Sequence, residues 1–250
     1  MESAILEVGR RRVVMECPAG ISSLHSIGRI QAFPPLRAWL QKLDQGIEVS
    51  KLTIQSVDAF RGGRIGFVKL SSDARCSGAR IPGIVFLRGP SAAVLLMLRL
   101  GGSDGDKRRV PSYLDSGYAV MVEQARAAVG EAALLELPAG MDDGGGVCTA
   151  VREVMEETGV AIEAKALVEL GGGVYPSPGA CDETMRLYAC EKVVTSDELA
   201  RVKDRLGGCR AEGEAITVRL VRICDLWQRT LDMKAMAALY LWDRHTQAQM

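Results

Sequence analysis

The sequence lacks the features that mark several common classes of protein. It has only two histidines, His25 and His245, so we expect no catalysis by histidine. Lysines and arginines number 31 and so do aspartates and glutamates, which leaves no excess positive charge for a nucleic acid or an acidic membrane surface. The longest apolar run, 92–98, is strand-length and much shorter than the ~18 residues of a membrane-spanning helix.

Paired cysteine motifs are also missing. The seven cysteines are an odd number and include no C-x-x-C pair, which argues against a disulfide framework or a zinc site. Residues 1–30 lack the apolar core of a secretory signal, and they contain Glu2, Glu7 and Glu16, whereas transit peptides avoid acids. We expect the cytoplasm or another reducing intracellular compartment, and organellar targeting stays open.

What the sequence does contain is typical of a globular α/β protein. Hydrophobic residues make up 48% and charged residues 25% of 250 residues, which suits one large domain, or one domain with an extension. We expect residues 1–30 to form an irregular arm. Further along, hydrophobic patterning predicts strands at 49–57, 65–70, 81–87, 92–100, 118–124, 134–137, 166–170, 184–190 and 215–221, and helices at 36–43, 197–205, 225–229 and 233–244. Strands interleaved with helices favour a mixed α/β sandwich.

An acidic helix ending at Gly159 is the most informative segment. Residues 152–160, Arg-Glu-Val-Met-Glu-Glu-Thr-Gly-Val, hold three glutamates, and like charges at this spacing repel by a few tenths of a kcal/mol per pair. At roughly 100° per residue, Glu153, Glu156 and Glu157 share one arc of the helix. The opposite, apolar arc contains Val147, Val151, Val154, Met155 and Thr158. A divalent cation would offset the repulsion, so the pattern predicts a metal site.

This segment resembles the Nudix box, G-x5-E-x7-R-E-U-x-E-E-x-G-U, in which U is aliphatic. The second half matches at every defined position from Arg152 to Val160. The first half departs, because eleven residues separate Gly140 from Arg152 where the pattern has thirteen. A run of three glycines occupies the region of the first box glutamate, and Asp142 and Asp143 are the nearest acids.

The resemblance extends over most of the chain, from about residue 34 to 244. The chain is similar to the ADP-sugar and ADP-ribose diphosphatases of the Nudix superfamily, especially the plant-type branch. The matching segments include Glu-Leu-Pro-Ala-Gly at 136–140, Val-Glu-Gln at 122–124, Pro-Ser-Pro-Gly at 176–179 and Cys-Asp-Glu at 181–183. The resemblance implies a Nudix α/β/α sandwich with a mixed sheet, preceded by a small β-rich subdomain. We place the arm at 1–30, the subdomain at 31–80 and the Nudix domain at 81–250.

The resemblance implies a particular metal site. Mg²⁺, or Mn²⁺ in its place, would be held by the backbone carbonyl of Ala139 with Glu153, Glu156 and Glu157. We also count Glu156 among the catalytic residues, together with Arg152. Arg152 would pair with a box glutamate and fix its orientation, although an ordinary surface ion pair is the alternative.

The other expected site residues lie outside the box. In the resembled branch the general base is a glutamate on a later loop, and Glu214 fits best, with Glu212 as the alternate. Arg126, Glu183 and Gly179 are the expected substrate contacts. For Arg126 the alternative is a salt bridge at the rim of the site, and for Glu183 a polar residue at a strand edge.

The resemblance finally implies an activity and partners. The expected reaction is hydrolysis of the pyrophosphate bond of ADP-sugars, such as ADP-ribose or ADP-glucose, to AMP and a sugar phosphate. The alternatives are a UDP-sugar diphosphatase and a non-catalytic Nudix module that binds nucleotide-sugars. We expect a nucleoside-diphosphate-sugar as substrate, no nucleic acid or membrane partner, and a homodimer built through the N-terminal subdomain.

Overall fold

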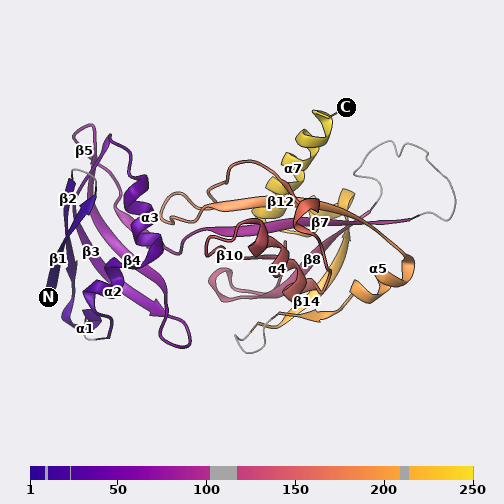
Figure 1. Cartoon of the computed structure of the whole chain (residues 1–250), viewed down its shortest axis with the longest axis horizontal. Helices are drawn as coiled ribbons and strands as arrows, with labels where there is room; N and C mark the ends of the chain where they lie inside the picture. The colour runs from indigo at the N-terminus through magenta and orange to yellow at the C-terminus, as the bar shows by residue number, and fades with distance from the viewer. Residues whose placement is uncertain (9–10, 23, 102–116, 209–213, 250) are drawn as a thin grey trace. The chain divides into compact units, whose positions relative to one another are not determined.

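The computed structural model describes the whole chain except residues 9–10, 23, 102–116, 209–213 and 250. It divides the chain into two compact units (Figure 1). Unit 1 consists of Met1–Pro90 and Ser177–Thr184, and unit 2 of Ser91–Pro176 and Met185–Met250. Within the described ranges, no helix is both long enough and apolar enough to cross a membrane.

Unit 1 is built on a six-stranded sheet. Its elements are β1 (Glu2–Val8), β2 (Arg11–Cys17), α1 (Ala19–Ser22), α2 (Ile27–Gln31), α3 (Pro34–Lys42), β3 (Ile47–Ala59), β4 (Ile65–Cys76), β5 (Ala79–Arg80) and β6 (Ile84–Leu87). The strand order is β1-β2-β3-β4-β5, with β6 also paired to β4, and only the β2–β3 pair is parallel among the described pairs of this sheet. Helix α3 begins with two prolines, which are tolerated in a first turn, and buries Leu36 and Leu40 one turn apart.

The N-terminal residues are structured rather than an irregular arm. Strands β1 and β2 pair along their length, and β2 continues into the sheet beside β3. The reason is the period-two burial of Val13, Met15 and Cys17, which join the core of unit 1. The unit also extends past the expected boundary at residue 80, because β6 pairs with β4.

Unit 2 is built on an eight-stranded mixed sheet. Its elements are β7 (Ser91–Leu100), β8 (Tyr118–Arg126), η1 (Ala127–Val129), β9 (Glu131–Glu136), β10 (Ala139–Met141), α4 (Val147–Thr158), η2 (Ala164–Ala166), β11 (Val168–Glu169), β12 (Met185–Val194), α5 (Ser196–Val202), β13 (Leu206–Gly207), β14 (Ile216–Arg222), η4 (Ile223–Asp225), α6 (Leu226–Arg229) and α7 (Met233–Gln247). The order is β11-β12-β7-β8-β14-β13, with β10 on β7 and β9 on β8. The neighbouring strands β12 and β7 are parallel.

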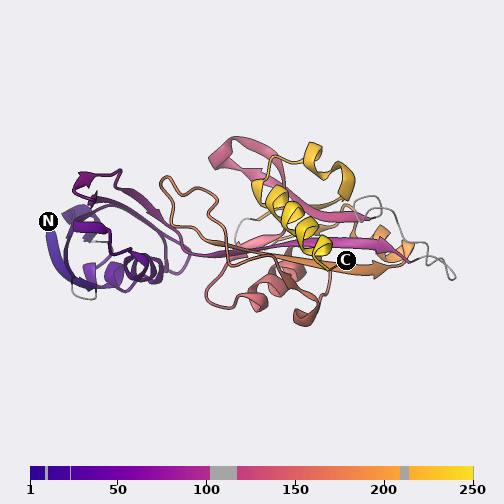
Figure 2. The ribbon, with the colours of Figure 1, turned by 90° about the horizontal axis from the view of Figure 1, so that it is seen from above.

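The sheet of unit 2 lies between two helical layers. Alternate residues of β7 point to opposite faces, as strand geometry requires. Val94 and Leu96 pack in the cluster that contains Val154 of α4, whereas Leu95 belongs to the cluster that contains Trp242 of α7. Figure 2 shows α4 and α7 on opposite sides of this sheet. The expected α/β/α sandwich with a mixed sheet is therefore confirmed.

Candidate active site

A strand, a turn and a helix bring the box residues together. Strand β10 follows Pro138 and pairs with β7, Ala139 lying opposite Ala93. Helix α4 begins after Gly146 and ends at Gly159, whose φ of 67° is the left-handed conformation that glycine adopts readily at a helix end. The apolar side of α4, including Val154, packs on the sheet and so fixes the glutamates relative to β10.

Two box glutamates turn toward β10. Glu157 is only 4% exposed, and its Oε2 accepts a hydrogen bond from the Ala139 N–H at 3.0 Å. The Glu153 carboxylate lies directly on Gly140, where the Cβ of any other residue would overlap it. Glu156 differs, because its side chain is 52% exposed. The site therefore has an inner pair of carboxylates and an outer one.

The helical wheel placed two residues of α4 incorrectly. Met155, expected on the buried arc, is 50% exposed, and Glu157, expected on the polar arc, is buried. For Glu157 the burial is offset by the Ala139 N–H, which gives its carboxylate a hydrogen-bond donor at the edge of the sheet.

Arg152 connects the inner and outer carboxylates. Its guanidinium lies 2.8 Å from Glu153 Oε1 and 3.3 Å from Glu156 Oε2. The expected pairing with a box glutamate is thus present. Because the Arg152 side chain is 53% exposed, the pairs orient carboxylates more than they stabilise the fold.

The pKa of Glu157 shows which charges meet at this carboxyl. Burial raises its pKa to about 8, and the negative charges of Glu153 and Glu214 act in the same direction. The Ala139 N–H and the positive charge of Arg126 oppose the rise. Glu153 of the box and Glu214 outside it therefore both raise the pKa of the buried Glu157 carboxyl. Carboxyl groups with strongly shifted pKa values are frequent at functional sites.

The candidate bases differ in what the structure shows. Glu214 is half-buried, stands just before β14, and is close enough to Glu157 to raise its pKa. Glu212 lies outside the described residues. The base assignment stays a prediction, and Glu214 is the candidate whose surroundings are known.

Arg126 forms an ion pair within unit 2. Its Nε donates to Glu136 Oε2 at 2.5 Å, and Lys234 Nζ lies 3.0 Å from the other oxygen of Glu136. Burial alone would raise the pKa of Glu136, but the charges and hydrogen bonds of Lys234 and Arg126 outweigh it and hold this pKa low. The salt bridge that we gave as the alternative role of Arg126 is therefore present. The Arg126 side chain is also 45% exposed, and its contact with substrate stays a prediction.

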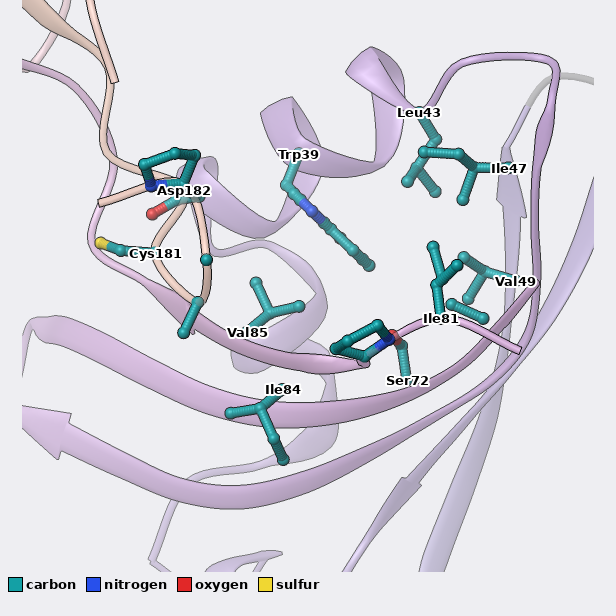
Figure 3. Close-up of a pocket in the computed structure, with 15 residues that line it drawn as sticks. Trp39, Leu43, Ile47, Val49, Ser72, Ile81, Ile84, Val85, Cys181 and Asp182 are labelled. Atoms are coloured by element: carbon teal, nitrogen blue, oxygen red, sulfur yellow. The ribbon is translucent and has the colours of Figure 1, made fainter. Parts of the chain in front are cut away.

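Gly179 and Glu183 belong to unit 1 rather than to the unit of the box. Glu183 pairs with Arg88 at 3.3 Å. Gly179 helps to line a cavity of about 240 Å³, into which Trp39 and Val85 project (Figure 3). For both residues the contact with substrate stays a prediction.

The donor set of the box suits a hard divalent cation. Within the part of the chain that the structure describes, no three His, Cys, Asp or Glu side chains are already arranged around a common point. Arg152 and the Ala139 N–H hold the glutamates instead. All the expected ligands are nevertheless oxygens, which hard cations prefer, and a cation beside the buried Glu157 would favour its ionised form.

Asp142 is a structural residue whose part the sequence did not reveal. This buried carboxylate accepts hydrogen bonds from Gly144 N at 3.1 Å, Gly146 N at 2.8 Å and Thr149 Oγ1 at 3.0 Å. These bonds lower its pKa although burial opposes them. Asp142 thus ties the shortened loop to the first turn of α4. An aspartate followed by glycines before a helix was the available signal.

Comparison with known proteins assigns the family. Residues 109–242, more than half of the chain, match the NUDIX domain. The chain belongs to the Nudix family. This Nudix protein is 36% identical over 252 residues to Nudix hydrolase 14, chloroplastic, of Arabidopsis thaliana, and the match spans 92% of this chain and 76% of that protein. A solved structure described as an ADP compounds hydrolase covers 81% of this chain and 97% of its own, with a TM-score of 0.47 and 18% identity. The first two similarities make this chain a Nudix hydrolase.

Proposed function

We propose that this Nudix hydrolase cleaves the pyrophosphate bond of ADP-sugars, such as ADP-ribose or ADP-glucose, into AMP and a sugar phosphate, with Mg²⁺ or, in its place, Mn²⁺. The observation that carries the proposal is the buried carboxyl of Glu157, on which Glu153, Glu214 and the Ala139 N–H all act. A pyrophosphate brings further negative charge, so this cluster binds it only with a cation between them.

Each residue has a part in the proposed reaction. Glu153, Glu156, Glu157 and the Ala139 carbonyl would hold the metal, which supplies charge neutralisation and a more acidic water when bound. Glu214 accepts a proton from water as the water oxygen bonds to phosphorus. The phosphoanhydride bond then breaks and its electron pair leaves with the second phosphate.

The choice of ADP-sugars rests on the resemblance of particular segments. They are the Pro-Ser-Pro-Gly loop at 176–179 and the Glu-Leu-Pro-Ala-Gly segment at 136–140. UDP-sugars would use the same chemistry and differ only in the base that is recognised. A binding module without catalysis would have little use for a buried carboxyl with a pKa of about 8 beside two further acids.

The test is a product analysis. The purified chain is incubated with ADP-ribose, ADP-glucose and UDP-glucose in the presence of Mg²⁺, and parallel samples contain EDTA. We expect AMP and a sugar phosphate from the ADP compounds and no product with EDTA. Faster release of UMP would favour the UDP-sugar alternative, and intact substrates throughout would favour the binding module.

Compartment and assembly are part of the same proposal. We propose a reducing compartment, because the seven cysteines are an odd number and include no C-x-x-C pair. The name of the relative from Arabidopsis thaliana permits an organelle. We also propose a homodimer. Light scattering is expected to give twice the chain mass of 26.9 kDa.

A further inference from the structure

The short strand β13 lies against the end of the metal-site helix. The last carbonyls of a helix lack partners within the helix. In α4 one of them, Glu156 O, accepts a hydrogen bond from Gly208 N at 3.3 Å. The neighbouring Gly207 approaches so closely that a Cβ at this position would overlap the carbonyl of Glu157. Backbone therefore touches backbone at the two positions where expected metal ligands stand.

The same strand is joined to the segment that carries Glu214. Leu206 pairs with Thr217 and Gly207 with Ile216, two residues after Glu214. Gly208 has a φ of 84°, and a Cβ there would stand 3.1 Å from the Cβ of Glu214. The two glycines thus contact α4 on one side and the segment that carries Glu214 on the other.

A third contact comes from the residue that leads into β13. The guanidinium of Arg205 lies on Gly159, at the C-terminal end of α4, where a Cβ would overlap it. A positive charge at this end of a helix is favourable because the helix dipole is negative there. Segment 205–208 therefore follows the last turn of α4 over its whole length.

We propose that Gly207 and Gly208 are positioning residues that fix the base Glu214 relative to the metal ligand Glu157. This inference rests on the proposed function, since it needs Glu214 as the base. Gly207 sets how near the β13–β14 pair approaches the helix, and the Gly208 N–H sets the register along it. A larger residue at position 207 displaces Glu214 without changing any group that reacts.

A double-variant cycle tests this proposal. Gly207→Ala, Glu214→Gln and the combination are compared for kcat and KM in Mg²⁺. Because small misplacements of catalytic groups are costly, we expect Gly207→Ala to lower kcat about 10- to 100-fold with little change in KM. In the Glu214→Gln background the same substitution should cost less than about twofold, because a displaced residue that is already inactive loses nothing more. Gly172→Ala is the matched control, since a Cβ at Gly172 meets nothing within 4 Å.

The results of this cycle either support or overturn the proposed positioning role of Gly207. Equal losses from Gly207→Ala in both backgrounds would overturn the proposal, because the glycine would then act through the helix or the fold. Near-wild-type kcat in Gly207→Ala or in Glu214→Gln would also overturn it. If circular dichroism shows that Gly207→Ala does not fold, Arg205→Ala replaces it in the cycle, with an expected loss of about twofold to fivefold confined to the Glu214 background. Failure of the proposed function is recognised separately, because the unmodified protein would then release no product.

Discussion

At the scale of the residue, Glu157 combines burial with the proposed role of a metal ligand. Its carboxyl group has nearly the same size and shape as an amide, and the side chain of a glutamine could still accept the hydrogen bond from the Ala139 N–H. A neutral amide, however, does not provide the charge that a divalent cation requires. We expect Glu157→Gln to lower turnover on the order of a hundredfold or more while the thermal unfolding profile stays close to wild type. Steady-state assays and circular dichroism measure both.

The control for this variant is Glu163→Gln. Glu163 is also in unit 2, and its side chain is 71% exposed beside Lys165. Its substitution should leave turnover unchanged. Wild-type turnover in Glu157→Gln itself would remove Glu157 from the metal site.

Asp142 gives a prediction about pH and stability at the same scale. Asp142→Ala leaves the Gly146 N–H and the Thr149 hydroxyl without their acceptor, which should lower the free energy of unfolding by about 1–3 kcal/mol at pH 7. The folded-state pKa of Asp142 is lowered, so its contribution is complete above the ordinary value of 3.8 and is lost as the pH falls through the folded value. The difference between variant and wild type should therefore shrink in acid.

Urea titrations at pH 7, 5 and 2.5 measure this difference on both sides of the ordinary pKa. Asp143→Ala is the matched control, because Asp143 is the exposed neighbour in the same loop, and we expect a change within about 0.5 kcal/mol. A difference between Asp142→Ala and wild type that grows in acid would contradict the assignment.

At the scale of the element, a buried ionic group joins the start of α7 to the end of β9. Lys234 Nζ lies 3.0 Å from Glu136 and 2.9 Å from Asp232, and Asp232 accepts the Leu137 N–H at 3.0 Å. Lys234→Met should lower the free energy of unfolding by about 3 kcal/mol, because the Glu136 carboxylate, 9% exposed, then keeps Arg126 but loses the ammonium group on its other oxygen.

A second variant separates the charge from the packing. In Glu136→Gln/Lys234→Met the carboxylate charge that lost its ammonium partner is gone, so part of the lost stability should return in urea unfolding. A double variant as unstable as the sum of its single variants would show that the two residues act independently.

The sequence predicted helices and strands well where the spacing of hydrophobic residues agrees with the residues that end an element. The strand expected at 92–100 is β7 (Ser91–Leu100), and the helix expected at 233–244 is α7 (Met233–Gln247). Residues 1–30 were missed because β2 shows its alternation over only three buried positions beside charged ones. No local pattern could predict that β7 pairs in parallel with β12, because strand pairing depends on side-chain packing between segments that are distant in the sequence.

The metal site stays a prediction, and its basis in the sequence is the charge of one helix. Three glutamates spaced along one helix are enough to indicate a metal site, because their mutual repulsion needs a positive partner. The burial of Glu157 and the glycine contacts of β13 were not predictable, because both depend on β10 and β13 reaching α4 from distant parts of the chain.

At the scale of the whole molecule, the chain passes between its two units three times, at 90–91, 176–177 and 184–185. The segment Ser177–Thr184 returns to unit 1 as an added edge of its sheet. Phe86 N donates to Ala180 O at 2.7 Å, and Asp182 N donates to Phe86 O at 3.2 Å. Residues 177–179 of the Pro-Ser-Pro-Gly segment therefore belong to a stretch held by Phe86, which precedes the region 109–242 that matches the NUDIX domain.

Asp182 should govern how firmly unit 1 holds this segment. Its Oδ1 accepts the Arg88 N–H at 2.7 Å and the Gly89 N–H at 3.2 Å. Asp182→Ala leaves both donors without this acceptor, and a loss of about 1.4 kcal/mol makes the opened segment tenfold more populated. We expect proteinase K to cleave within 177–184 about tenfold faster, as mass spectrometry of the fragments would show. Asp182→Asn keeps the accepting oxygen and should stay near wild type, whereas equal cleavage of both variants would mean that the backbone pairs with Phe86 suffice.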